Sequence, residues 1–214
     1  MRIVISGTVG IGKSTTSNLL VKTLEEKGYD VSFLNEETVE SVYLDYYYQS
    51  PAEWAFIAQL DFLMGRFKQW LTDERSRENA SDKRITVYDR HFLDDYVFAE
   101  LHTIKENISA VNSITYQAVY KELTEKMAKL DSRPDHFILL EAPLDTIMDR
   151  LRGRGREEET EVDMEYWKDL YHNYYTRPMF QNHFKSNTKN YTKLNTVDKT
   201  PEQIVSEIMN IIGL

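Results

Sequence analysis

Five short apolar runs along the chain predict buried β-strands. Aliphatic and β-branched residues fill each run almost continuously, which is typical of parallel strands covered on both faces. Residues common in turns bound the runs, as expected where strands end. The runs are Arg2–Ser6, Val31–Asn35, Ile85–Asp89, His136–Glu141 and, with a weaker pattern, Tyr191–Asn195.

Longer segments between these runs repeat apolar residues at helical spacing. They are Ser14–Lys27, Ala52–Leu71 and Ile114–Leu130. The alternation of strands and helices predicts an α/β fold of three layers, in which helices flank a five-stranded parallel sheet. The polar stretch Asp73–Lys83 predicts a surface loop. We expect a single domain over residues 1–214, because this length suits one hydrophobic core.

Composition narrows the functional classes. Hydrophobic residues make up 41% of the 214 residues and charged residues 29%, as in an ordinary soluble domain. A net charge of −9 argues against nucleic-acid binding through counterion release, and no apolar run reaches the roughly 18 residues of a membrane helix. The chain has no cysteine, its five histidines fall outside metal-ligand spacing, and its first residues lack a secretory pattern. We therefore expect a cytoplasmic protein that binds neither membrane nor nucleic acid.

The first predicted strand leads directly into a P-loop, the motif G-x-x-x-x-G-K-S. Glycines in such a loop let backbone N–H groups point into one concavity, and the next helix turns its positive end toward the same anion. Lys13 would reach the β- and γ-phosphates, and the Ser14 hydroxyl would hold Mg²⁺. We expect a nucleoside triphosphate to contact Gly7, Thr8, Val9, Gly10, Ile11, Gly12, Lys13, Ser14 and Thr15.

The remaining motifs favour a small kinase among the P-loop proteins. The base-reading N-K-x-D and the switch D-x-x-G of regulatory GTPases are both absent, and motor ATPases are usually larger. Kinases of small molecules tend to close an arginine-rich lid over the migrating phosphoryl group, whose spread negative charge needs cationic donors. The stretch "RLRGRGR" predicts such a lid at about residues 150–160, with two glycines that suit a moving segment.

Five motifs in order give the chain a resemblance to a known family. They are "GTVGIGKST", "EETVE" after the second strand, "YQSPAEWAFIAQ", "YDRHFLDD" after the third strand, and "RLRGRGREEE". Together they resemble the deoxyribonucleoside kinases, in particular the bacterial deoxyadenosine, deoxyguanosine and deoxycytidine kinases. The resemblance spans nearly the whole chain. It implies transfer of a phosphoryl group from ATP, with Mg²⁺, to the 5′-hydroxyl of a deoxyribonucleoside, and it implies a homodimer.

The resemblance also assigns the catalytic carboxylate. The family places a glutamate after the second strand as the general base for the 5′-hydroxyl, usually in E-P-V. Here Glu37 aligns best, although Thr38 stands where the family has proline and the neighbouring Glu36 leaves the register open. By the same resemblance Asp89 helps to hold Mg²⁺ and Arg90 contacts the 5′ region, in a sequence that departs from the family's Glu-Arg-Ser.

Further residues are assigned to substrate by resemblance alone. Gln59 would bind the base, and Arg66 would pair with Asp95, or with Asp94 in another register, to read it; the family's thymidine-preferring members have an apolar residue in place of this arginine. Tyr48 and Glu159 would bind the 3′-hydroxyl. The lid residues expected to bind phosphate are Arg150, Arg154 and Arg156.

Two other functions remain open from the sequence. A thymidylate or other nucleoside-monophosphate kinase shares the P-loop, the Asp-Arg pair and a lid. However, it needs cations for the acceptor's own phosphate near the second strand, where "NEETVE" offers three carboxylates. A nucleotide-binding regulatory protein without turnover would bind ATP but release no ADP with any nucleoside.

Overall fold

The computed structural model describes the chain except residues 40, 78–83 and 155–163, and the side chains at positions 37 and 154 also lie outside the described part. Its elements run in the order β1 (Arg2–Ser6), α1 (Lys13–Glu26), β2 (Asp30–Leu34), a 3₁₀ turn (Glu36–Thr38), α2 (Leu44–Gln49), α3 (Pro51–Arg77), β3 (Arg84–Asp89), α4 (Phe92–Ile104), α5 (Ala110–Lys129), β4 (His136–Glu141), α6 (Leu144–Arg154), α8 (Met164–Tyr175), α9 (Pro178–Ser186), β5 (Asn190–Asn195) and α10 (Pro201–Ile212).

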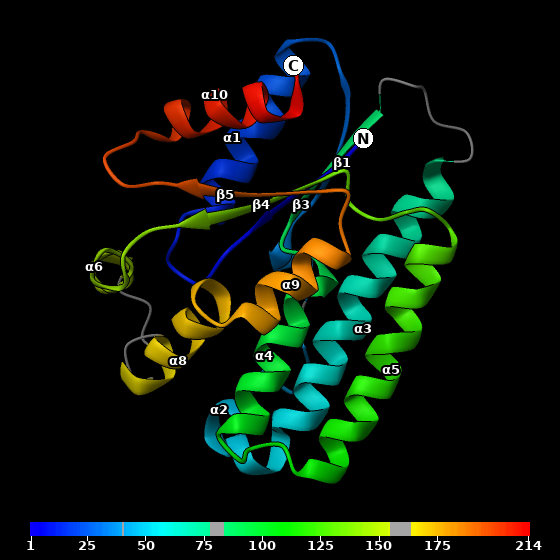
Figure 1. Cartoon of the computed structure of the whole chain (residues 1–214), viewed down its shortest axis with the longest axis vertical. Coiled ribbons are helices and arrows are strands. Elements are labelled where there is room, and N and C mark those ends of the chain that lie inside the picture. The colour runs from blue at the N-terminus through cyan, green and yellow to red at the C-terminus, as the bar shows by residue number, and fades with distance from the viewer. Residues whose placement is uncertain (40, 78–83, 155–163) are drawn as a thin grey trace.

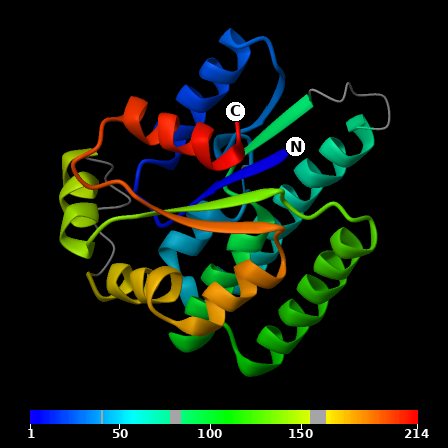
Figure 2. The same cartoon turned by 45° about the horizontal axis from the view of Figure 1, so that its top comes forward.

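All five predicted strands form one parallel sheet, in the order β2-β3-β1-β4-β5. Helices α1 and α10 cover one face, and α3, α4, α5 and α9 lie on the other (Figures 1 and 2). The prediction of a three-layer α/β fold is therefore confirmed. Strand β1 sits at the centre with all five residues buried, which explains why its sequence is apolar at nearly every position.

The sheet brings three segments to one edge. The P-loop follows β1, the 3₁₀ turn follows β2, and Arg90 follows β3. Because the strands are parallel, their carboxyl ends lie side by side, and this edge is where open α/β sheets bind ligands.

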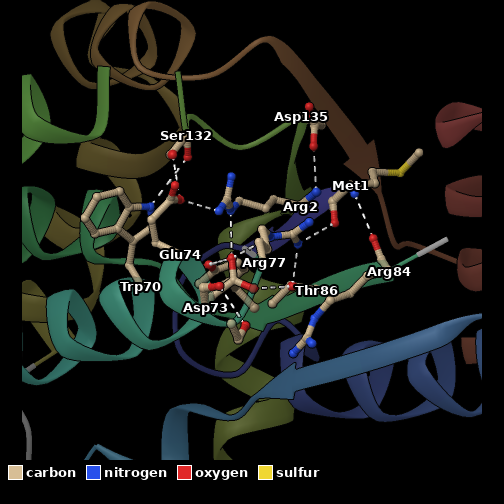
Figure 3. A network of polar contacts seen from close by, with 12 residues as sticks. Met1, Arg2, Trp70, Asp73, Glu74, Arg77, Arg84, Thr86, Ser132 and Asp135 are labelled. Atoms are coloured by element: carbon tan, nitrogen blue, oxygen red, sulfur yellow. Dashed lines mark hydrogen bonds and ion pairs between the residues drawn. The ribbon is translucent and has the colours of Figure 1, made fainter. Parts of the chain in front are cut away.

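The prediction of a surface loop over Asp73–Lys83 is wrong at its start. Helix α3 continues to Arg77, and the Asp73 side chain is fully buried. Asp73 accepts hydrogen bonds from Arg2 on β1 (2.7 Å) and Thr86 on β3 (2.5 Å), with Arg77 3.1 Å away on its own helix (Figure 3). The sequence predicts a solvated loop here because the side chains that pair with Asp73 lie far away along the chain.

Within the described residues, no helix is both long enough and apolar enough to cross a membrane.

Candidate active site

The P-loop adopts the backbone that its glycines predict. Gly7, Gly10 and Gly12 have φ values of 140°, 80° and 103°, which residues with a Cβ rarely adopt. A Cβ at Gly10 would also lie 2.7 Å from the Leu151 side chain of α6. The first hydrogen bond of α1 runs from the Thr16 N–H to the Gly12 carbonyl (3.0 Å). The preceding N–H groups therefore point out of the helix end, where an anion can accept them.

Lys13 lies buried beside this loop. Its ammonium donates to the Thr8 carbonyl over 3.3 Å and lies 3.9 Å from Oε2 of Glu36. Burial, followed by the charge of Arg90, lowers the pKa of Lys13 to about 8. A triphosphate would supply the negative charge that this desolvated cation lacks.

Glu36 is the carboxylate that the structure brings to the site. Its Oε1 lies 2.6 Å from Nε of Arg90 and 3.2 Å from Nη2 of Arg66. Burial would raise the pKa of this carboxyl, but the charges of Arg90, Lys13 and Arg66 outweigh it and lower the pKa to about 2. The side chain of Glu37, the predicted base, lies outside the described residues.

Arg90 is held from three directions. Its backbone has a φ of 68°, unusual for a residue with a side chain, and its N–H donates to the Ile5 carbonyl (3.1 Å). The guanidinium donates from Nη1 to the Tyr174 hydroxyl (2.9 Å) and lies over the Phe98 ring, 4.8 Å from its centroid. With Glu36 at Nε, the group has little freedom to rotate.

Arg66 and Asp95 form the predicted pair. Nη1 of Arg66 donates to Oδ1 of Asp95, and both side chains are buried, as is that of Gln59. Burial raises the pKa of Asp95 to about 7. Asp94, the alternative partner, is engaged elsewhere, because it accepts from Tyr174 (3.0 Å) and from the His91 N–H (3.1 Å). The structure thus favours the Asp95 register.

Asp89 and Ser14 fit a magnesium ion. Both Asp89 oxygens are buried, and among the described residues neither accepts a hydrogen bond of ordinary geometry. Burial raises the pKa of Asp89, while Lys13 and the nearby Ser14 hydroxyl partly oppose this rise. No group of three or more His, Cys, Asp or Glu side chains in the described part could hold a metal alone. Two protein oxygens suit Mg²⁺, which usually keeps waters and substrate phosphates as its other ligands.

The remaining residues predicted to contact substrate or phosphate lie in different parts of the structure. Tyr48 lies on α2 and is 47% exposed. Arg150 donates to the Ile11 carbonyl of the P-loop and to the Thr196 hydroxyl, each over 3.1 Å, and its phosphate contact stays a prediction. The side chain of Arg154 and the whole of Arg156 and Glu159 lie outside the described residues.

The sequence did not indicate two tyrosines of α8 that contact the site. Tyr174 contacts Arg90 and Asp94, whereas the Tyr175 hydroxyl donates to the Leu140 carbonyl (2.8 Å) and accepts from the Thr8 N–H (3.2 Å). Both belong to the run "YHNYY", in which nothing separates a polar contact from ordinary aromatic packing.

The comparison with family models decides the family. The model described as deoxynucleoside kinase matches residues 3–213. The chain belongs to the deoxynucleoside kinase family. It is therefore a kinase, and the alternative of a nucleoside-monophosphate kinase is not favoured.

Individual relatives of this deoxynucleoside kinase agree with the family. The chain is 31% identical to a deoxyadenosine/deoxycytidine kinase of Bacillus subtilis over 98% of its own length and 92% of the relative's. It is 27% identical to a deoxyguanosine kinase of the same organism, covering 80% and 75%. A deoxyadenosine kinase from M. mycoides, solved with bound dATP, superposes with a TM-score of 0.78 at 27% identity, covering all of both chains.

Proposed function

We propose that this kinase transfers the γ-phosphoryl group of ATP to the 5′-hydroxyl of deoxyadenosine, deoxyguanosine or deoxycytidine in nucleotide salvage. The observation that carries the proposal is the cluster of Glu36, Arg90 and Lys13 at the carboxyl edge of the sheet, beside the P-loop. It combines an acceptor for a proton with cations that face the migrating group.

Glu36 is the better supported general base of the two neighbouring glutamates. Its carboxylate is oriented by Arg90 and Arg66 and lies near Lys13, whose predicted partner is the γ-phosphate. A pKa of about 2 makes it a weak base in the free enzyme. Phosphoryl transfer tolerates this, because its loose transition state demands positioning more than a strong nucleophile. The role predicted for Glu37 stays a prediction.

The donor half of the site rests on the P-loop. Lys13 and the N–H groups of the loop and helix end would bind the β- and γ-phosphates. Ser14 and Asp89 would hold Mg²⁺, which neutralises charge on the phosphates when bound. Phosphate contacts from Arg154 and Arg156 in the lid remain predictions from the sequence, as does the 3′-hydroxyl contact of Glu159.

The acceptor half reads the base through buried polar groups. The Arg66–Asp95 pair leaves Nε of Arg66 and Oδ2 of Asp95 without a hydrogen bond in the described part of the chain. A purine or cytosine edge could satisfy these atoms together with Gln59, whereas a buried polar group left unpaired costs free energy. Tyr48 would bind the sugar. This arrangement supports the purine and cytosine deoxynucleosides over thymidine.

The single-domain organisation, the homodimer and the cytoplasmic location also remain predictions. Two large apolar side chains of α5, Val111 and Ile114, are 73% and 69% exposed. Covering them in a homodimer would remove this apolar surface from water. Light scattering of the purified chain would measure the oligomer directly.

A substrate panel tests the proposed function. The purified protein is incubated with MgATP and each of deoxyadenosine, deoxyguanosine, deoxycytidine, thymidine and thymidine monophosphate, and nucleotide products are separated by chromatography. We expect a 5′-monophosphate and ADP from at least one of the first three. Product from thymidine monophosphate alone, or ATP binding without any product, would overturn the proposal.

A further inference from the structure

We infer that Tyr174 is a positioning residue for phosphoryl transfer, because its hydroxyl links Asp94 to Arg90 and so keeps the Arg90 guanidinium turned toward Glu36. The inference rests on the proposed role of Glu36 and Arg90 and extends it to a residue of α8. Tyr174 itself touches neither reacting group.

The direction of the two hydrogen bonds is fixed by chemistry. A tyrosine hydroxyl has one proton to donate, and a guanidinium can only donate. The 2.9 Å contact therefore runs from Nη1 of Arg90 to the Tyr174 oxygen, and the 3.0 Å contact runs from the hydroxyl to Oδ1 of Asp94. The hydroxyl thus presents its acceptor lone pair to Arg90 only while Asp94 takes its proton.

The two hydrogen bonds form a relay from Arg90 through Tyr174 to Asp94, and Asp94 is itself held in place. It also accepts from the Ser6 hydroxyl at the end of β1, and its other oxygen accepts from the His91 N–H, where it completes the capping box of α4. Asp94 is fully buried. The end of β1 and the start of α4 therefore each hold one oxygen of the carboxylate to which Tyr174 donates.

Arg90 needs such a hold because its surroundings do not fix the guanidinium otherwise. Its backbone is in the left-handed region, a conformation that costs free energy in a residue with a side chain and persists when the surroundings enforce it. The Phe98 face restrains the plane of the group but offers no direction within that plane. Tyr174 and Glu36 supply the two polar contacts, at Nη1 and at Nε.

Loss of the Tyr174 hydroxyl should therefore act on turnover more than on binding. Without it, Arg90 can rotate away from Glu36, and both the carboxylate and the cation leave the geometry that the transition state needs. The base contacts of Arg66, Asp95 and Gln59 do not involve Tyr174, so nucleoside binding should change little.

The test compares Tyr174→Phe with a matched control, Tyr88→Phe. Both tyrosines are buried, and each donates to a buried aspartate, Tyr88 to Asp73 over 2.9 Å. Both variants should lose a similar amount of thermal stability. We expect Tyr174→Phe to lower kcat at least tenfold, about 1.4 kcal/mol of transition-state stabilisation, with an unchanged KM for the nucleoside, whereas Tyr88→Phe should keep kcat.

A double variant tests the route through Arg90. We expect Arg90→Lys to lower kcat, and the addition of Tyr174→Phe to lower it little further, because a coupled pair is not additive. Additive losses would overturn the relay, as would a wild-type kcat in Tyr174→Phe or an equal loss in Tyr88→Phe. If Arg90→Lys and Glu36→Gln both kept full turnover, the proposed function of the cluster would fail; if only Tyr174→Phe did, the relay alone would fail.

Discussion

Nε of Arg90 lies 2.6 Å from Oε1 of Glu36, and this contact joins the residue after β3 to the turn after β2. The two segments are neighbours because β2 and β3 pair in parallel with their ends in register. The contact supports Glu36 as the general base, whereas the alignment of the sequence motif favours the adjacent Glu37. It therefore leads directly to a pair of variants.

Glu36→Gln should lower kcat by roughly 100-fold or more, the usual contribution of a general base. The amide keeps the size of the side chain but cannot take the 5′-hydroxyl proton. Nucleoside affinity, measured by calorimetry, should stay close to that of the wild type. Glu37→Gln is the matched control at the adjacent position. A large loss of kcat in Glu37→Gln with little in Glu36→Gln would restore the sequence prediction and refute ours.

The fold could be predicted because its signals are local. Each strand is a continuous apolar run in the sequence. The glycines of the P-loop indicate a backbone with positive φ, which only glycine adopts easily. Helix α3 was predicted too short because Asp73 is charged, and its partners on β1 and β3 come from remote parts of the chain.

The site could be predicted only in part, for a related reason. The family resemblance implies that Arg66 and Asp95 pair, and the structure places the two side chains in contact. The register of Glu36 depends on how a 3₁₀ turn aims its side chains, for which the sequence has no periodic pattern. Tyr174 lies on the last turn of an amphipathic helix, where a tyrosine that bonds to Arg90 looks the same as one that only packs.

Arg66→Met should be more harmful alone than in combination with Asp95→Ala. The pKa of Asp95 is about 7 beside Arg66 and rises when that cation is lost, so the single variant bears an unpaired buried charge only in alkaline solution, where the charge costs about 3–5 kcal/mol. The double variant removes both charges, so in urea at alkaline pH its free energy of unfolding should exceed that of Arg66→Met. Both variants should lose activity with deoxyadenosine and deoxycytidine and gain preference for thymidine.

The exposed Lys68, two residues along α3, provides the control Lys68→Met, which should match the wild type in both measurements. A double variant less stable than Arg66→Met would show that the unpaired Asp95 carboxylate is not what destabilises the single variant.

Asp89→Asn should raise the Mg²⁺ concentration needed for half-maximal activity at least tenfold, about 1.4 kcal/mol. A second readout separates metal binding from catalysis. Both Asp89 oxygens are buried, and burial raises the pKa of this carboxyl, so its charged form is disfavoured when no metal is bound. In EDTA, Asp89→Asn should therefore have the higher Tm. An unchanged Mg²⁺ dependence, or a lower Tm in EDTA, would count against Asp89 as a magnesium ligand.

Asp73→Asn should destabilise the fold by about 3–5 kcal/mol, because it removes the acceptor charge of a buried ion pair. Burial would raise the pKa of Asp73, but hydrogen bonds from Thr86 and Arg2 outweigh it and hold the pKa below its usual value. The stabilisation is thus present above the unfolded pKa of about 3.9 and is lost as the pH falls through the lower folded value. In urea unfolding at several pH values, the free energies of unfolding of the wild type and Asp73→Asn should converge in acid.

The matched control for Asp73→Asn is Asp149→Asn, since Asp149 pairs with Arg152 but is 75% exposed. Its free energy of unfolding should stay within about 1 kcal/mol of the wild type. If the gap between the wild type and Asp73→Asn stayed constant from neutral to strongly acidic pH, the charge of Asp73 would contribute nothing to the fold.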